Sequence, residues 1–208
     1  MTSKTNKTVK MTSVDKLVSV ACEGLHGRFW YRDAAAQIDY VSWLEGWDRN
    51  VFAGVIATTS PRCSVLRNIR MSLHFMHFHD IRVVPMKGVR TSVLRFLGGK
   101  GIAGQKTSAF YNNLSGCPNS VTLDVWMSYA LGVDQTDFNR AANRRKATGR
   151  IVGVARRLGV TPAEAQAAVW TGYRARSGYN QSPFSVASEY FAARDNGWVI
   201  EGCSVHAE

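Results

Sequence analysis

The chain has 208 residues, 45% of them hydrophobic, which suffices for one globular domain with a sizeable core. Its 26 lysines and arginines against 15 acidic residues give a formal net charge of +11, which is typical of a nucleic-acid-binding protein. The alternatives are a protein that binds a membrane surface and a merely soluble basic protein. No apolar run approaches the roughly 18 residues of a membrane span, and the polar N-terminus is not a secretory signal, so we expect a cytoplasmic, DNA-associated protein without membrane contact.

Helical spacing of apolar residues runs through almost the whole sequence. It predicts helices over 14–23, 29–44, 51–59 (capped by Asn50), 61–77 (opened by Pro61), 89–97 and from about 105 to 114. Further helices are predicted within 121–131, 134–143, 147–158, 161–176 and 186–194. We therefore predict an all-α protein, with residues 1–12 as a disordered basic tail and 13–208 as a single helical domain. A C-terminal extension begins at about 178, and its residues 198–200 are expected to pack back on the domain.

A glycine-rich turn, 98–104, connects two of these predicted helices and precedes Lys106. A helix N-terminus directs backbone N–H groups and partial positive charge outward, so Gly99, Gly101, Gly104 and Gln105 are candidates for binding a DNA phosphate. The same field lowers the pKa of a nearby amine, which would make Lys106 a usable nucleophile. A solvated lysine beside an ordinary connection is the alternative.

Two further features supply candidate functional residues. Asp124 ends a short apolar run, where it is either a functional carboxylate or the N-cap of the next helix. The segment from Arg140 to Arg176 holds nine lysines and arginines but one acid, which favours phosphate contacts over a solvated face of mixed sign. Its candidate DNA-binding residues are Arg144, Arg145, Lys146 and Arg150.

The sequence resembles the helix-hairpin-helix (HhH-GPD) DNA glycosylases, including those similar to 8-oxoguanine DNA glycosylase. In that family a Gly-x-Lys turn opens a helix and an aspartate follows, as in Gly104-Gln105-Lys106 and Thr122-Leu123-Asp124 here. Residues 56–69, with Asn68, are similar to the family's early helix pair. The usual Leu-Pro-Gly-Val-Gly hairpin is replaced by Gly101-Ile102-Ala103-Gly104.

The resemblance implies a two-lobed helical fold, acting as a monomer on double-stranded DNA with a flipped base. Asp124 would stabilise the positive charge that develops on the sugar as the base leaves, and Lys106 would attack C1′ to form a Schiff base and permit strand cleavage. Trp30, Phe110 and Trp126 are candidates for the base pocket. The alternatives are an enzyme of a viral DNA base-hypermodification pathway and a non-catalytic DNA-binding module in which Lys106 only binds phosphate.

Neither a metal nor another cofactor is expected. His74, His77 and His79 lie close in sequence but lack an acidic or cysteine partner at a recognised metal-site spacing. The four cysteines are scattered without a Cys-x-x-Cys motif, which indicates reduced thiols and no iron–sulfur cluster.

Overall fold

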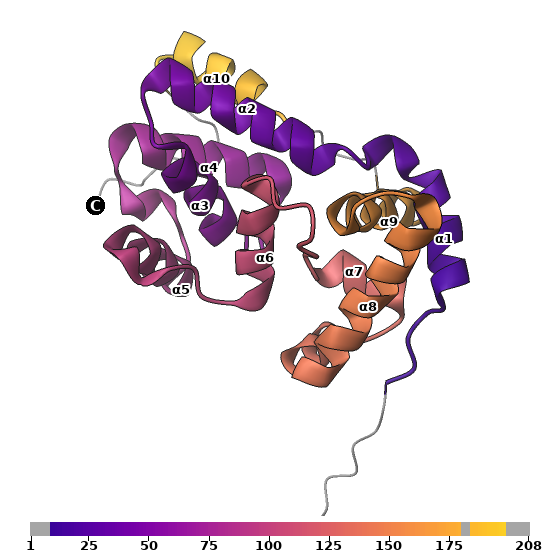
Figure 1. Cartoon of the computed structure of the whole chain (residues 1–208). Helices are drawn as coiled ribbons and strands as arrows, with labels where there is room; N and C mark the ends of the chain where they lie inside the picture. The colour runs from indigo at the N-terminus through magenta and orange to yellow at the C-terminus, as the bar shows by residue number, and fades with distance from the viewer. Residues whose placement is uncertain (1–8, 180–183, 199–208) are drawn as a thin grey trace, which may run out of the picture. The chain divides into compact units, whose positions relative to one another are not determined.

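The structure, a computed structural model, describes residues 9–179 and 184–198. Every regular element in this part of the chain is a helix, which confirms the all-α class (Figure 1). The chain divides into two compact units, each built from two separate stretches of sequence. Unit 1 comprises Met1–Phe29 and Pro118–Gln181, and unit 2 comprises Trp30–Cys117 and Ser182–Glu208.

Unit 1 contains four α-helices: α1 (Val14–Glu23), α7 (Val125–Leu131), α8 (Ala141–Leu158) and α9 (Pro162–Arg176). Helix α9 packs against α1, α7 and α8, and its N-terminus has the predicted capping box of Thr161 and Glu164. The core includes Leu17, Met127 and Ile151, which are all fully buried. Three helices and the short α7 therefore share one hydrophobic core, which fixes the beginning of α7 and the end of α9.

Two glycines allow α1 and α9 to approach closely. A Cβ on Gly24 would lie 2.1 Å from the carbonyl oxygen of Ala168, and a Cβ on Gly172 would lie 2.0 Å from that of Val20. Because both obstructing atoms belong to the backbone, a side chain at either position would push the helices apart.

Unit 2 is arranged around a buried helix. Its elements are α2 (Trp30–Glu45), α3 (Arg49–Thr59), α4 (Val65–Phe78), α5 (Lys87–Arg95), α6 (Gln105–Leu114) and α10 (Val186–Asp195). Every residue of α3 from Phe52 to Thr59 is buried, and α2, α4, α5 and α6 pack against this helix. Helix α10 packs against α2 and α4. The nearly continuous apolar sequence of α3 thus places it at the centre of the unit.

Several predicted helix beginnings are wrong. Helix α5 begins at Lys87 rather than 89. The helices predicted over 134–143 and 147–158 are instead a 3-10 turn, Gln135–Asn139, followed by the single continuous helix α8 from Ala141.

The N-cap of α3 is Asp48, not Asn50, because the Asp48 side chain accepts hydrogen bonds from the N–H groups of Asn50 and Val51. Helix α4 begins after Ser64 rather than at Pro61, because the Ser64 hydroxyl caps the N–H of Arg67.

The ends of the chain extend beyond the described residues. Residues 1–8 of the predicted tail lie outside them, whereas Met11 is buried in the core of unit 1 and the N–H of Thr12 donates to the carbonyl of Leu131. In the predicted C-terminal extension, the Trp198 ring stacks on His77 of α4, with 3.7 Å between centroids. Trp198 therefore packs back as expected, while Val199 and Ile200 lie outside the described residues.

Candidate functional site

Asp124 lies at the N-terminus of α7 in unit 1 and is its N-cap. One carboxylate oxygen, Oδ1, accepts a hydrogen bond of 2.9 Å from the N–H of Met127. The other, Oδ2, accepts a hydrogen bond of 3.0 Å from the indole Nε1 of Trp170 on α9. The predicted capping role is confirmed, and the second donor holds the carboxylate in one orientation between two helices.

A series of contacts links this carboxylate, through Trp170, to one cation and two further aromatic rings. The guanidinium carbon of Arg174 lies 4.4 Å from the ring centroid of Trp170 and 5.2 Å from that of Trp126. The Trp126 ring also meets the edge of Tyr179, at 4.7 Å between centroids. We call Asp124, Trp126, Trp170, Arg174 and Tyr179 the Asp124 cluster.

The Asp124 cluster combines buried and exposed groups. Asp124, both tryptophans and Arg174 are partly buried, whereas Tyr179 is 56% exposed. Burial lowers the pKa of the Arg174 guanidinium, while Asp124 and Tyr179 act in the opposite direction. An arginine stays protonated at neutral pH, so the cluster presents a carboxylate, a cation and aromatic faces together near the surface.

The end of α9 brings Tyr179 to the cluster. After Arg176 the chain turns through Gly178, whose φ is +73°, and the N–H of Tyr179 donates to the carbonyl of Arg174. This arrangement is a left-handed helix ending that favours glycine. The local sequence therefore directs the tyrosine back toward α7.

The predicted glycine turn connects α5 and α6 in unit 2. Gly99, Gly101 and Gly104 have φ of +73°, +67° and +88°, values that favour glycine. Helix α5 ends at Arg95 and one wider helical turn follows it, so the predicted end at Leu97 is slightly too late. Gly104 is the N-cap of α6 and offers no side-chain cap, so water or a ligand must satisfy the N–H groups of the first turn.

Lys106 lies in the first turn of α6, as predicted, and is partly buried. Gln105 beside it is exposed. Lys106 belongs to unit 2 and Asp124 to unit 1, so a site that contains both residues stays a prediction.

Asn68, which carries part of the family resemblance, is buried and internally bonded. Its Nδ2 donates to the carbonyl of Ile56 at 3.0 Å, and its Oδ1 accepts from the Thr59 hydroxyl at 2.6 Å. The side chain therefore joins α3 to α4 within unit 2.

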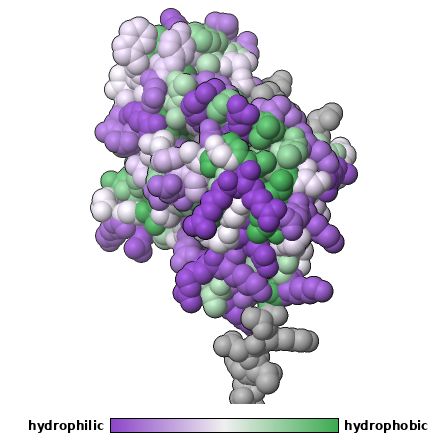
Figure 2. All heavy atoms as spheres, turned by 45° about the vertical axis from the view of Figure 1, so that its right-hand side comes forward, coloured by the Kyte–Doolittle hydropathy of each residue, from purple (hydrophilic) through white to green (hydrophobic). Residues whose placement is uncertain are grey.

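Helix α8 carries the four basic residues predicted to contact DNA, and two of them have internal partners. Arg144 donates to the carbonyl of Phe138 at 2.6 Å, and Lys146 donates to that of Val9 at 2.7 Å. Arg145 is exposed and Arg150 partly buried, and neither makes an ion pair with any residue that the structure describes. Figure 2 shows hydrophilic side chains over much of the face where α1, α8 and α9 come forward.

Two other predicted pocket residues belong to unit 2. The rings of Trp30 and Phe110 lie 6.1 Å apart, and Trp30 also meets the edge of Phe184 at 4.9 Å. These rings pack with one another inside unit 2, whereas Trp126 belongs to the Asp124 cluster.

Sequence reasoning missed Trp170, Arg174 and Tyr179. Trp170 and Arg174 are four positions apart on α9, and this spacing indicates a shared helix face. The spacing was visible in the sequence, but their proximity to Asp124 depends on the packing of α7 against α9.

No group of three or more histidine, cysteine, aspartate or glutamate side chains in the described ranges is arranged to hold a metal ion. His74 and His77 instead take part in ring contacts with Phe78. Among the described helices, none is both long and apolar enough to cross a membrane.

Comparison with known proteins identifies the family. Residues 21–177 match the model of a family of unknown function (DUF7178). The chain belongs to this family. No curated protein and no solved structure matches the chain.

Proposed function

We propose that this protein binds double-stranded DNA and releases a damaged or modified base from it, with Asp124 as the catalytic carboxylate. The observation that carries the proposal is the Asp124 cluster: an oriented carboxylate beside aromatic faces and a cation, in a chain of net charge +11. The resemblance to helix-hairpin-helix glycosylases, with their two-lobed fold, supports the same function.

The cluster offers the groups that base release requires. As the bond between C1′ and the base breaks, positive charge develops on the sugar, and a nearby carboxylate stabilises it. Water then forms the new bond to C1′ and gives up a proton, while the base leaves with its bonding electron pair and is protonated. Aromatic rings such as those of Trp126 and Tyr179 provide faces on which an extruded base stacks.

Lys106 has a second proposed role. If its amine rather than water attacks C1′, the product is a Schiff base, which borohydride reduces to a stable covalent bond between protein and DNA. This chemistry requires Lys106 and Asp124 to meet at one sugar. Gly99, Gly101, Gly104 and Gln105 would bind the adjacent phosphate through the uncapped beginning of α6.

One observation favours a second candidate, a DNA-binding module without catalysis. Both oxygens of Asp124 already accept hydrogen bonds, one from the α7 backbone and one from Trp170. A carboxylate that only caps a helix and fixes an indole explains these contacts without a reaction.

Mass analysis of the free bases released from DNAs of different modification content tests the proposal. We expect the wild type to release a base from at least one of them. Salt-sensitive binding without release from any DNA supports the binding module, and a product that keeps its glycosidic bond indicates a base-modifying enzyme.

Borohydride trapping separates the two roles of Lys106. If the lysine is the nucleophile, Lys106→Gln abolishes trapping and largely preserves DNA binding. Lys100→Gln, which removes an exposed cation from the same turn, serves as the matched control and keeps trapping. Trapping that persists in Lys106→Gln excludes this lysine as the nucleophile.

A further inference from the structure

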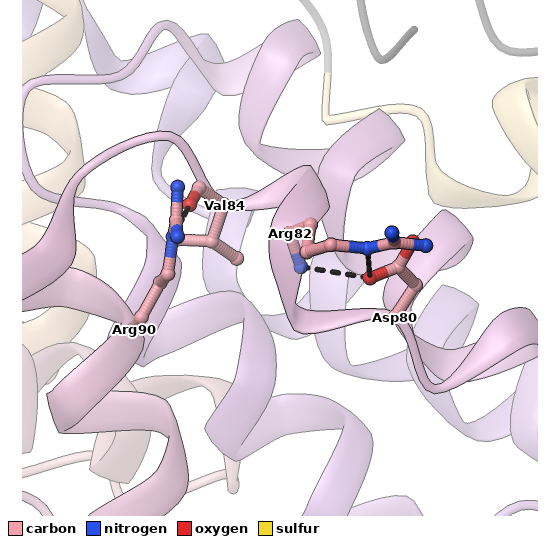
Figure 3. Close-up of polar contacts among 4 residues, drawn as sticks. All are labelled: Asp80, Arg82, Val84 and Arg90. Atoms are coloured by element: carbon pink, nitrogen blue, oxygen red, sulfur yellow. Dashed lines mark hydrogen bonds and ion pairs between the residues drawn. The ribbon is translucent and has the colours of Figure 1, made fainter. Parts of the chain in front are cut away.

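The segment from Ile81 to Cys117 of unit 2 contains six lysines and arginines and no acidic residue. Two of its cations have internal partners, as Figure 3 shows. Arg82 forms an ion pair of 2.9 Å with Asp80, which precedes the segment, and Arg90 donates to the backbone carbonyl of Val84. Asp80, the carboxylate that precedes α5, is therefore already neutralised.

The other four cations form no ion pair within the residues that the structure describes: Lys87, Arg95, Lys100 and Lys106. Lys87, Arg95 and Lys100 are also exposed. The outer side of α5 and the glycine turn therefore form a surface of unbalanced positive charge.

Two leucines lie within this surface. Leu94 of α5 is 55% exposed, and Leu97 in the wider turn that follows α5 is 41% exposed, although Val89 and Val93 of α5 are buried. The two valines lie on the buried side of α5, a helix that packs against α3, and the exposed leucines lie on the outer side.

Phe96, one of the two residues between the leucines, holds the end of the helix in place. A Cβ on Gly54 of α3 would lie 2.0 Å from Cζ of Phe96, so the Phe96 ring occupies the notch that this glycine leaves. Phe96 thus anchors this end of α5, which with Leu94 and Leu97 we call the tip, to α3, the buried helix of unit 2. The exposed leucines on either side of it are carried on an anchored backbone rather than on a free loop.

We propose that Leu94 and Leu97 form an apolar wedge that enters duplex DNA between neighbouring base pairs, while Lys87, Arg95 and Lys100 bind the flanking phosphates. The inference rests on the proposed DNA binding and adds to it a second contact, on unit 2, that distorts the duplex. Apolar side chains inserted at a base step unstack it and kink the helix.

Two properties favour duplex DNA as the partner of the tip: its charge and the spacing of its two leucines. A stretch of unit 2 with no acidic residue across 37 successive positions, 81 to 117, suits a polyanion. Leu94 and Leu97 are only three positions apart at the end of the helix, and two neighbouring apolar side chains suit a single base step. An anionic membrane requires a longer apolar helix face, and the remaining apolar residues of α5 point into unit 2.

The test uses the full chain and a duplex carrying 2-aminopurine, whose fluorescence rises when its neighbours unstack. The wild type is expected to bind and raise the fluorescence. The double variant Leu94→Ser/Leu97→Ser should bind about tenfold more weakly and lose the rise, by analogy with the loss of base-stacking contacts. Leu66→Ser on α4 changes another exposed leucine of unit 2 and should behave as wild type. Lys100→Gln should weaken binding but keep the fluorescence rise.

Three other outcomes would contradict the proposed wedge. If the double variant binds and unstacks like the wild type, the wedge is wrong and the proposed DNA binding stands. If the wild type binds no DNA at about 50 mM salt, both fail. If the double variant loses binding only to phosphatidylserine vesicles, the tip is a membrane contact instead. A circular dichroism melt checks that the variants are folded, and the single variant Leu97→Ala provides a milder change at the same tip.

Discussion

Asp124 connects local structure to the proposed chemistry, because each of its two oxygens has a different N–H donor. An asparagine at this position keeps one acceptor for Met127 but turns an N–H₂ group toward the indole N–H of Trp170, so two donors face each other. We expect Asp124→Asn to lower the free energy of unfolding by about 1–3 kcal/mol, measured by urea denaturation.

The structure also predicts how this cost is relieved. Trp170→Phe keeps a ring against Arg174 but removes the indole donor, so it should relieve the conflict. The double variant Asp124→Asn/Trp170→Phe should therefore lose less stability than the sum of the two single variants. Strictly additive losses would contradict the hydrogen bond between the two side chains.

His74 gives unit 2 a defined pH dependence. Burial lowers its pKa, Asp80 opposes that shift, and His77 adds to it. The unfolded chain therefore binds more protons than the folded chain, and the free energy of unfolding should fall as pH decreases through about 6.5 toward the lowered pKa. His74→Phe should flatten the dependence of the free energy of unfolding on pH, measured by denaturation curves between pH 7.5 and 5.

The control variant is His79→Asn. It replaces an exposed residue in a left-handed conformation that asparagine accepts, and it should retain the slope of stability against pH. An unchanged slope in His74→Phe would exclude this histidine as the source.

At the residue scale, the sequence was informative where a local rule applied. Asp124 was recognised as a candidate N-cap because aspartate before an apolar helical pattern is a short-range signal. Its Trp170 partner was not found, because that contact spans 46 positions and depends on how α9 packs. The internal hydrogen bonds of Arg144 and Lys146 were missed for the same reason: charge patterns do not show which backbone carbonyls a cation reaches.

At the scale of elements, the contact between α1 and α9 depends on two glycines. Gly172→Ala should destabilise the protein by about 1–3 kcal/mol, because the new methyl group meets the Val20 carbonyl. Gly149→Ala on the neighbouring α8 is the matched control, since nothing lies within 4 Å of its added Cβ. That variant should be more stable by about 0.5–1 kcal/mol, because alanine favours helix. Thermal unfolding of both variants measures the contrast, and equal shifts would contradict the close approach of the helices.

The sequence predicted most of the helices, and it did so best where capping residues mark them. Thr161, Pro162 and Glu164 located the beginning of α9 correctly. The predictions were wrong at α3 and α4, where several residues compete for the cap. Asp48 precedes Asn50 and caps the helix, and Ser64 rather than Pro61 opens the next one. A propensity rule does not decide between neighbouring residues that can all cap a helix.

At the scale of the whole molecule, the proposed DNA binding has an electrostatic signature. Affinity should fall steeply between about 50 and 200 mM salt, because each phosphate contact releases counterions. Replacing Arg145 and Arg150 together by glutamine should reduce the slope of log affinity against log salt by about 2, roughly one for each lost contact. Arg144→Gln is the control: it removes a cation held by the Phe138 carbonyl and should change the slope less. Equal slopes for wild type and double variant would remove α8 from the interface.

Sequence patterns could not predict how the chain divides into two units. Unit 1 joins the N-terminal residues to the stretch that begins at Pro118, and unit 2 takes up the C-terminal α10. Helical periodicity identifies which face of each helix is apolar but does not identify the helix that covers it. The pairing of helices within each unit therefore comes from the structure and not from the sequence pattern.

Base release by the variant Asp124→Asn/Trp170→Phe is the most direct test of the proposed catalytic carboxylate. This double variant lacks the charge of Asp124. It also lacks the indole N–H of Trp170, which conflicts with asparagine, so it should stay folded and bind DNA. On a DNA from which the wild type releases a base, we predict that Trp170→Phe releases the same base and that the double variant releases none. Release by the folded double variant at the wild-type rate would show that Asp124 only caps α7 and would contradict its role in catalysis.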